Sequence, residues 1–129
     1  MALRLASVST PTLEVETLWR EVTEGSRFLR GASTVLEGLG DLSSLCARGA
    51  LWLGTDEDPV SLAVLEDGVV KILFVTPERR RRGVGRETLL QLREAAYAVD
   101  AWALPGDRAS KSLYESIGWR ARLLTMRGD

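Results

Sequence analysis

Three β-rich runs in the middle of the chain constrain most strongly how this sequence can fold. Residues 50–55, 60–65 and 69–75 are apolar and rich in branched side chains, and short polar turns separate them. The second turn contains Asp67-Gly68, a pair typical of tight hairpins. The sequence therefore predicts an antiparallel meander of three strands.

A helix and a further strand follow the meander. Apolar side chains recur at helical spacing in residues 83–97, and residues 99–104 form another β-rich run. A helix that joins two strands of one sheet makes these strands parallel. We therefore expect the strand at 99–104 to lie parallel to the strand at 69–75.

The two ends of the chain are expected to complete an α+β fold, in which helices flank a mixed, mostly antiparallel sheet. A length of 129 residues predicts a single domain, with a helical region over 1–49 and a core over 50–129. The further expected elements are a strand at 3–7, a helix at 11–24 with Thr10 as its cap and Pro11 as its first residue, one or two short helices in 25–49, a helix at 107–117 between Asp107 and Gly118, and a strand at 120–126.

Composition excludes several kinds of site. The chain has no histidine, so it cannot use an imidazole base, a Ser-His-Asp triad or a histidine-ligated zinc ion. Its single cysteine, Cys46, cannot form an internal disulfide or a cysteine-rich metal site, and is expected to be a small buried apolar residue. No metal is expected.

Neither a secretion signal nor an apolar run long enough to span a membrane is present, so a cytoplasmic location is expected.

Charge is divided unevenly along the chain. Residues 1–70 carry five basic and eleven acidic side chains, a balance of −6, whereas residues 71–129 carry twelve basic and seven acidic side chains, a balance of +5. This division indicates that the C-terminal half binds an anion and that the N-terminal half faces a cationic acceptor. Chance segregation of charge along the chain would explain the same numbers.

The turn between the strand at 69–75 and the following helix is the most informative segment. It contains four consecutive arginines, residues 79–82, followed by Gly83 and Gly85. Free amides at a helix start attract anions, and glycines allow the backbone to approach the anion closely. A diphosphate is therefore the expected ligand. The pattern is neither a Walker loop nor a dinucleotide fingerprint, and the simpler alternative is a solvated basic turn.

The residues of this turn resemble a known family. The pattern Arg80-x-x-Gly83-x-Gly85, preceded by Val75-Thr76-Pro77, resembles the Arg/Gln-x-x-Gly-x-Gly/Ala signature of the GNAT N-acetyltransferases. About 20 residues further on, residues 107–119 are similar to that family's second pattern, Asn-x-x-Ala-x-x-Leu/Phe-Tyr-Glu-x-x-Gly-Phe. Two patterns in the right order are more specific than either alone. The resemblance covers residues 60–126, and the first 50 residues match only in being helical.

The resemblance implies that acetyl-coenzyme A binds where the parallel strands at 69–75 and 99–104 splay apart. Amides of the turn would hold the diphosphate, the backbone of the first strand would pair with the pantetheine arm, and arginine side chains would tune affinity. Asp107 replaces the asparagine of the second pattern and also caps the last helix. The implied cofactor residues are Leu73, Phe74, Val75, Arg80, Arg81, Arg82, Gly83, Val84, Gly85, Arg86 and Asp107.

Tyr114 is the catalytic residue that the resemblance implies, as a proton donor to the thiolate leaving group. A phenol has a pKa of about 10, against about 8.5 for a thiol, so it stays protonated at neutral pH. Helical spacing places Ala109, Leu113 and either Ser116 or Ile117 on the apolar stripe of the last helix, and places Ser110 with Tyr114 on the adjacent one. Tyr114 could instead simply fill space in the cofactor pocket. The other tyrosine, Tyr97, and the four tryptophans are expected to be packing residues.

No general base is evident from the sequence. Residues 68–71, where some family members carry a glutamate, contain no carboxylate, and Trp102 occupies the other position where the family places one. Water is therefore expected to take the proton. Glu66, Asp67 and residues 56–58 are candidates to assist, although ordinary turn positions explain them as well.

The leading hypothesis for function is transfer of an acetyl group from acetyl-coenzyme A to a primary amine of a small molecule or peptide, by direct attack. The alternative is a non-catalytic module that binds acyl-coenzyme A, since the expected carboxylates are missing. Nucleic-acid binding through the arginine run is disfavoured by the acidic pI of about 5.6. No membrane partner is expected. The strand at 120–126 offers one edge through which a homodimer could form.

Overall fold

The computed structural model describes residues 2–26, 29, 31–104, 107–122 and 126. Five strands form one sheet in the order β1-β2-β3-β4-β5, antiparallel except for the parallel pair β4 and β5. This arrangement confirms the expected α+β fold and the three-stranded meander. The strands are β1 (Arg4–Ser7), β2 (Leu51–Asp56), β3 (Asp58–Glu66), β4 (Val69–Val75) and β5 (Asp100–Ala101).

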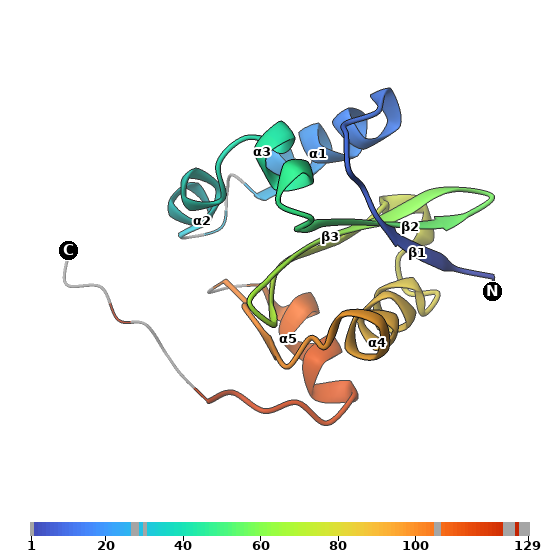
Figure 1. The fold of residues 1–129 in the computed structure, drawn as a ribbon. Coiled ribbons are helices and arrows are strands. Elements are labelled where there is room, and N and C mark those ends of the chain that lie inside the picture. Colours follow the sequence, from blue (N-terminus) through green and yellow to red (C-terminus); the bar gives the residue numbers. More distant parts are fainter. Residues whose placement is uncertain (1, 27–28, 30, 105–106, 123–125, 127–129) are drawn as a thin grey trace.

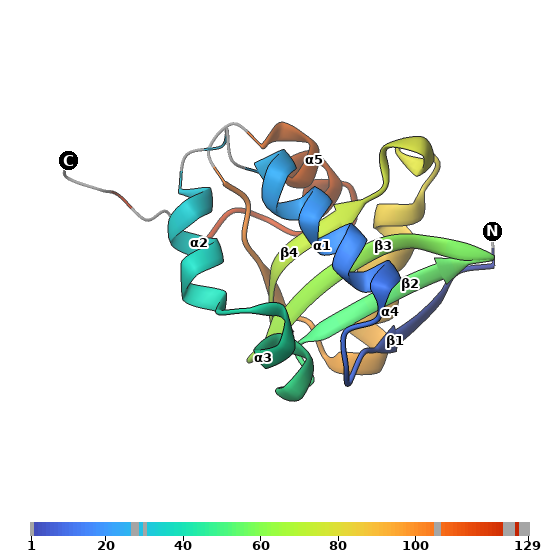
Figure 2. The ribbon, with the colours of Figure 1, turned by 90° about the horizontal axis from the view of Figure 1, so that it is seen from above.

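Helices cover both faces of the sheet. As Figures 1 and 2 show, α1, α2 and α3 lie on one face, and α4 and α5 lie on the other. Within the described part of the chain, no helix has both the length and the apolar character needed to cross a bilayer. The helices are α1 (Leu13–Ser26), α2 (Ala32–Leu39), α3 (Leu42–Ala47), the 3₁₀ turn η1 (Pro77–Arg79), α4 (Val84–Ala96) and α5 (Arg108–Ser116).

The central strand β3 has an apolar core on each side. One cluster lies toward α1 and α3 and includes Leu62 and the buried thiol of Cys46, as expected from the sequence. The other lies toward α4 and α5 and includes Ala63 and Leu89. Because successive side chains of a strand point to opposite faces, a strand covered on both faces must be apolar at nearly every position. The continuous apolar run of β3 satisfies this requirement.

The parallel strands β4 and β5 separate almost as soon as they meet. They pair only at Val69 with Asp100 and at Val70 with Ala101, and the amide of Trp102 donates to the carbonyl of Val70 at 2.9 Å. Beyond this point, no strand formed by the described residues lies beside β4 on that side. The strand expected over 99–104 is therefore only two residues long, because divergence from β4 ends the hydrogen-bonded ladder. This opening is the splay that the family resemblance implied.

Two expectations for the ends of elements were wrong. The first helix begins at Leu13, and the hydroxyl of Thr12, rather than Thr10, caps it by accepting from the amide of Val15 at 3.2 Å. Thr12 offers the same hydroxyl two residues later, so Pro11 stays outside the helix. Residues 120–122 are not in a strand, because the two-residue β5 offers almost no edge to pair with. The rest of that expected strand falls largely outside the described residues.

A buried hydroxyl pair joins α4 to the middle of the sheet. The hydroxyls of Ser61 and Thr88 lie 2.8 Å apart, and Thr88 donates to the carbonyl of Val84 at 2.8 Å. Thr88→Val keeps the shape but leaves the Ser61 hydroxyl without its partner, so we expect a loss of about 1–3 kcal/mol in the free energy of unfolding. Urea denaturation measures this loss. The double variant Ser61→Ala/Thr88→Val should recover part of it, and a double variant less stable than the single one would contradict the argument.

Candidate active site

The open edge of β4 presents backbone groups that no strand satisfies. The amide of Thr76 donates to the carbonyl of Val60 on β3 at 2.9 Å, so the backbone groups of Thr76 point toward β3. Backbone groups of alternate residues point to opposite sides of a strand. Those of Leu73 and Val75 therefore point to the open edge, whereas those of Phe74 point to β3. Of the three residues expected to pair with a pantetheine arm, two have backbone groups oriented for it.

The turn after β4 leaves the start of α4 without a cap. Gly83 precedes the helix with a φ of 81°, and among the described residues no side chain caps the helix by a hydrogen bond. The first helical bond, from the amide of Glu87 to the carbonyl of Gly83, is 3.0 Å long. The amides of Val84, Gly85 and Arg86 therefore have no acceptor within the helix. They lie at the positive end of the dipole of a 13-residue helix, which is a favourable place for an anion.

Gly85 lets α4 start close to its neighbours. A Cβ atom built there would lie 3.2 Å from Cδ2 of Leu113 on α5 and 3.4 Å from Cγ2 of Val75 on β4. A side chain at this position would therefore fill the space between the helix start, Leu113 and Val75, and Leu113 would have to shift by a few tenths of an ångström. The second glycine of the motif has a packing role that keeps the free amides near the open edge of β4.

The arginines of the turn have different roles. Arg79 pairs with Asp56 at 3.2 Å, which ties the turn to the end of β2. The Nε atom of Arg80 donates to the carbonyl of Val75 at 3.0 Å, and its guanidinium lies 5.5 Å from the ring centroid of Phe74. The Arg80 side chain thus covers part of the open edge. The side chains of Arg81, Arg82 and Arg86 are exposed beside the uncapped helix start.

A cleft passes between β4 and β5 where the two strands diverge. Residues of α1 and α2, with Leu29 between them, form one wall, and residues of α5 form another. Figure 2 shows where these helices lie relative to β4. Apart from the α5 residues and Lys71, the lining is mostly apolar. The lining residues are Ser26, Leu29, Ala32, Val35, Leu36, Lys71, Ile72, Leu73, Trp102, Leu104, Asp107, Ser110 and Tyr114.

Tyr114 lies in this cleft and is also part of the core. It is only 7% exposed, and its ring stacks on that of Trp119 with 6.0 Å between centroids. It is the only fully buried residue of α5, whereas Ala109 is exposed and Leu113 only partly buried. The buried face of α5 is therefore centred on Tyr114, one position after Leu113, which the sequence placed on the apolar stripe. The reason is that α5 packs against the sheet through Tyr114. The sequence could not show which face of this short helix would turn inward.

Burial and a nearby carboxylate keep Tyr114 protonated. Burial is the main cause that raises the pKa of its phenol, and the negative charge of Asp107 adds to it. Asp107 itself caps α5, accepting from the amide of Ser110 at 3.2 Å and from its hydroxyl at 2.7 Å. The expected cap is confirmed. Tyr114 is thus a neutral hydroxyl that can donate a hydrogen bond within a largely apolar cleft.

Two aromatic residues expected in the core lie outside it. Tyr97 ends α4 in a left-handed conformation and is 80% exposed. Trp102 follows β5 and is 47% exposed, with its ring in the wall of the cleft. Both residues lie at ends of elements, where no further layer packs over them. Trp19, Trp52 and Trp119 are partly buried against the two clusters, as expected.

The acidic residues considered as helpers in proton removal do not line the cleft. Glu66 and Asp56 are engaged in ion pairs, and Asp67 forms the hairpin turn with a φ of 52°. Among the described residues that line the cleft, Asp107 is the single carboxylate. Two acidic residues of the N-terminal half, Glu21 and Glu24, line a second, more open pocket beside Arg80.

Lys71 is the residue of this region that sequence reasoning missed. It lies in the cleft wall at an irregularity of the β3–β4 ladder, where Val64 pairs with Ile72 and Leu65 pairs with Val70. A signal was present, because Lys71 is the only charged side chain in the apolar run of β4. Its direction could not be predicted, since the extra residue in the ladder changes which way the side chain points.

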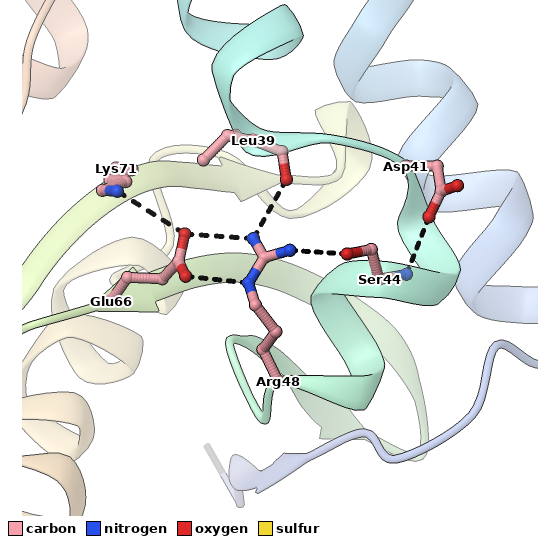
Figure 3. A network of polar contacts seen from close by, with 6 residues as sticks. All are labelled: Leu39, Asp41, Ser44, Arg48, Glu66 and Lys71. Atoms are coloured by element: carbon pink, nitrogen blue, oxygen red, sulfur yellow. Dashed lines mark hydrogen bonds and ion pairs between the residues drawn. The ribbon is translucent and has the colours of Figure 1, made fainter.

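Glu66 links β3 to α3 and to Lys71 (Figure 3). Both carboxylate oxygens accept from Arg48, at 3.0 and 3.2 Å, and Arg48 also donates to the carbonyl of Leu39 and the hydroxyl of Ser44. The hydrogen bond from Arg48 is the main cause that lowers the pKa of Glu66 from its ordinary value of 4.5. The pairing therefore fixes the end of β3 against α3.

The lowered pKa of Glu66 predicts a dependence of stability on pH. A carboxyl with a lowered pKa in the folded state stabilises the protein above its unfolded pKa, and this contribution is lost as pH falls through the folded value. In Glu66→Gln, the free energy of unfolding should therefore fall less steeply below about pH 4.5 than in the wild type. Denaturation between pH 3 and 7 measures this. Glu94→Gln, at an exposed position of α4, is the control and should keep the wild-type profile.

No family model matches the sequence. The mycothiol acetyltransferase of Clavibacter sepedonicus is 44% identical over 83 residues, which cover 59% of this chain. The chain spans about a quarter, 27%, of that relative's length.

Solved structures show the same fold at low sequence identity. A GNAT-family acetyltransferase from Bacillus cereus has a TM-score of 0.67 and 11% identity, and covers 100% of this chain and 90% of its own. A diaminobutyrate acetyltransferase from Paenibacillus lautus, in complex with L-2,4-diaminobutyric acid and coenzyme A, has a TM-score of 0.55 and 16% identity, and covers 90% of this chain and 74% of its own. The solved structures thus show that this chain has the GNAT fold, with a sheet that splays at β4, and part of the mycothiol acetyltransferase is similar to it in sequence.

Proposed function

We propose that this domain transfers an acetyl group from acetyl-coenzyme A to a primary amine of a small molecule or peptide, by direct attack. The observation that carries the proposal is the uncapped start of α4 at the end of a strand with an open edge. The relatives support it, because the names of the similar proteins are those of acetyltransferases, and one of them holds coenzyme A.

The residues of the site fit this cosubstrate. Free amides of Val84, Gly85 and Arg86 suit a diphosphate, and the exposed arginines Arg81 and Arg82 add positive charge beside it. Leu73 and Val75 offer backbone groups to an extended arm, as in the addition of a strand to a sheet edge. For the arm to pair with Val75, Arg80 must leave the carbonyl that it now covers.

Acetyl-coenzyme A would supply an acyl carbon activated by a thiol leaving group. The cleft would hold the amine so that its nitrogen forms a bond to this carbon while the carbon–sulfur bond breaks. The nitrogen loses one proton and the sulfur gains one, so the products are an amide and a free thiol. Tyr114 would donate a hydrogen bond to the departing thiolate. Because its pKa is raised, the phenol favours hydrogen bonding over complete loss of its proton.

Removal of the proton from an ammonium substrate would fall to water. Asp107 is the single carboxylate among the described residues of the cleft, and it is engaged in capping α5. The same observation favours the second candidate function, a module that binds acyl-coenzyme A without catalysis. The two functions differ in whether an acetylated product forms.

The test is to incubate the protein with acetyl-coenzyme A and a panel of primary amines, and to measure free thiol and acetylated amine together. Equal amounts of the two products, formed at a rate proportional to protein, are expected. Calorimetric titration with coenzyme A runs in parallel. Tight binding with no product from any amine would replace the proposal with the non-catalytic module, and no binding at millimolar ligand would remove both.

A further inference from the structure

Lys71 gives the cleft a positive charge that the proposed reaction does not use. Its side chain is 21% exposed, and it lies in the wall of the cleft beside Ile72 and Leu73. Of the residues that the structure describes on the opposing side of the cleft, Leu29, Ala32, Val35 and Leu36 are apolar and Ser26 is polar. A charged group in such a place is expensive to desolvate unless a charge of the opposite sign comes close.

Glu66 does not neutralise Lys71 fully. Both oxygens of this carboxylate already accept from Arg48, at 3.0 and 3.2 Å, whereas the Nζ atom of Lys71 lies 3.5 Å from one of them. Figure 3 shows the carboxylate between the two cations. Two positive charges share one negative charge, so the group of three residues carries a net charge of about +1 at neutral pH.

Trp102 holds the ammonium of Lys71 at the cleft. The Nζ atom lies 5.2 Å from the centroid of the Trp102 ring, within the range of a cation–π contact, and both residues line the cleft. An ammonium has three N–H donors, and Glu66 accepts at most one at a long distance. Donors of Lys71 therefore remain for a ligand in the cleft.

A second charge lies on another wall. Asp107 caps α5 and Tyr114 lies within it, whereas Lys71 belongs to β4. A molecule with a positive amine and a negative group would meet an opposite charge on each side. An amine with no anionic group would bring no opposite charge to the remaining donors of Lys71. The carboxylates of the N-terminal half that line a pocket, Glu21 and Glu24, lie in the neighbouring pocket beside Arg80.

We propose that the acceptor is an amine that also carries a carboxylate, and that Lys71, held by Glu66 and Trp102, binds this carboxylate in the cleft. The inference rests on the proposed acetyl transfer and adds the class of acceptor. It replaces the purely cationic acceptor that the charge division of the sequence suggested.

Matched pairs of acceptors test the inference. Each amino carboxylate is compared with its carboxamide, for example γ-aminobutyrate with γ-aminobutyramide and L-lysine with L-lysinamide, by kcat/KM for acetyl transfer. The wild type should prefer the carboxylates by about tenfold or more, since hydrogen bonds between charged groups are the strong ones. Lys71→Arg should keep the preference. Lys71→Met should remove it, mainly through a higher KM for the carboxylates.

Glu66→Gln is an independent test, in which the preference for amino carboxylates should change in the opposite direction to that in Lys71→Met. Loss of the carboxylate leaves the charges of Arg48 and Lys71 uncompensated, so the preference for amino carboxylates should increase several-fold. Thermal unfolding and coenzyme A titration verify that each variant is folded, and a variant that does not fold leaves the other arm to decide.

The experiment distinguishes failure of this inference from failure of the proposed acetyl transfer. Equal rates within each pair in the wild type, or a preference that survives in Lys71→Met, would overturn the inference while acetyl transfer itself stands. Transfer to carboxamides and simple alkylamines alone would also overturn it. Absence of transfer to any amine would contradict the proposed function and, with it, this inference.

Discussion

Gly83→Asp is expected to abolish detectable binding of coenzyme A at micromolar concentrations. The substitution places a carboxylate beside the free amides at the start of α4, where the proposed diphosphate would lie. Two unit charges about 5 Å apart repel by about 3 kcal/mol at an effective dielectric constant of about 20, which is about a hundredfold in Kd for each charge of the diphosphate. Calorimetric titration with coenzyme A measures the effect.

Gly83→Asn is the matched control for this substitution. Asparagine has nearly the same shape as aspartate, and both residues tolerate the left-handed conformation that Gly83 adopts at a φ of 81°. The backbone strain in the two variants should therefore be similar. The Kd of Gly83→Asn for coenzyme A should increase far less than that of Gly83→Asp. The loss in Gly83→Asp should also diminish at high salt. Undiminished binding by Gly83→Asp would place the diphosphate elsewhere and remove the basis of the proposed function.

Tyr114→Phe is expected to lower kcat for acetyl transfer by about 10²-fold, which is typical for loss of a proton donor to a leaving group. The ring is 7% exposed and stacks on Trp119, and phenylalanine preserves this packing. The Kd for coenzyme A should therefore stay near that of the wild type. Steady-state kinetics with a good acceptor, together with titration, separates the two quantities. Since the pKa of Tyr114 is raised, its ionisation should cause no loss of activity up to about pH 10.

Tyr97→Phe is the control for the loss of a phenolic hydroxyl. Tyr97 is 80% exposed at the end of α4 and does not line the cleft. This variant should have the kcat of the wild type. An unchanged kcat in Tyr114→Phe would remove Tyr114 from the mechanism and assign it to packing alone. An equal decrease in both variants would point to an effect on the fold.

Much of the fold could be predicted because its signals are local. The Asp67-Gly68 turn determines the hairpin between β3 and β4, and both residues have the positive φ angles that such a turn requires. The predicted cap at Asp107 acts within three residues of the chain. The turn around Gly83 is equally local, so the position of the helix start could be predicted before the structure.

The sequence by itself determined the order of the elements up to α5, the hairpin and the start of α4, because each depends on residues close together in the chain. The helix between β4 and β5 determined that these two strands are parallel. Only the tertiary structure decided that Tyr114 lies inside while Tyr97 lies outside, that β5 ends after two residues, and that Lys71 lies in the cleft. These outcomes depend on how α5, β4 and the α1–α2 segment pack against one another. Hydrophobic periodicity shows that a helix has a buried face, but packing between distant segments decides which residue completes it.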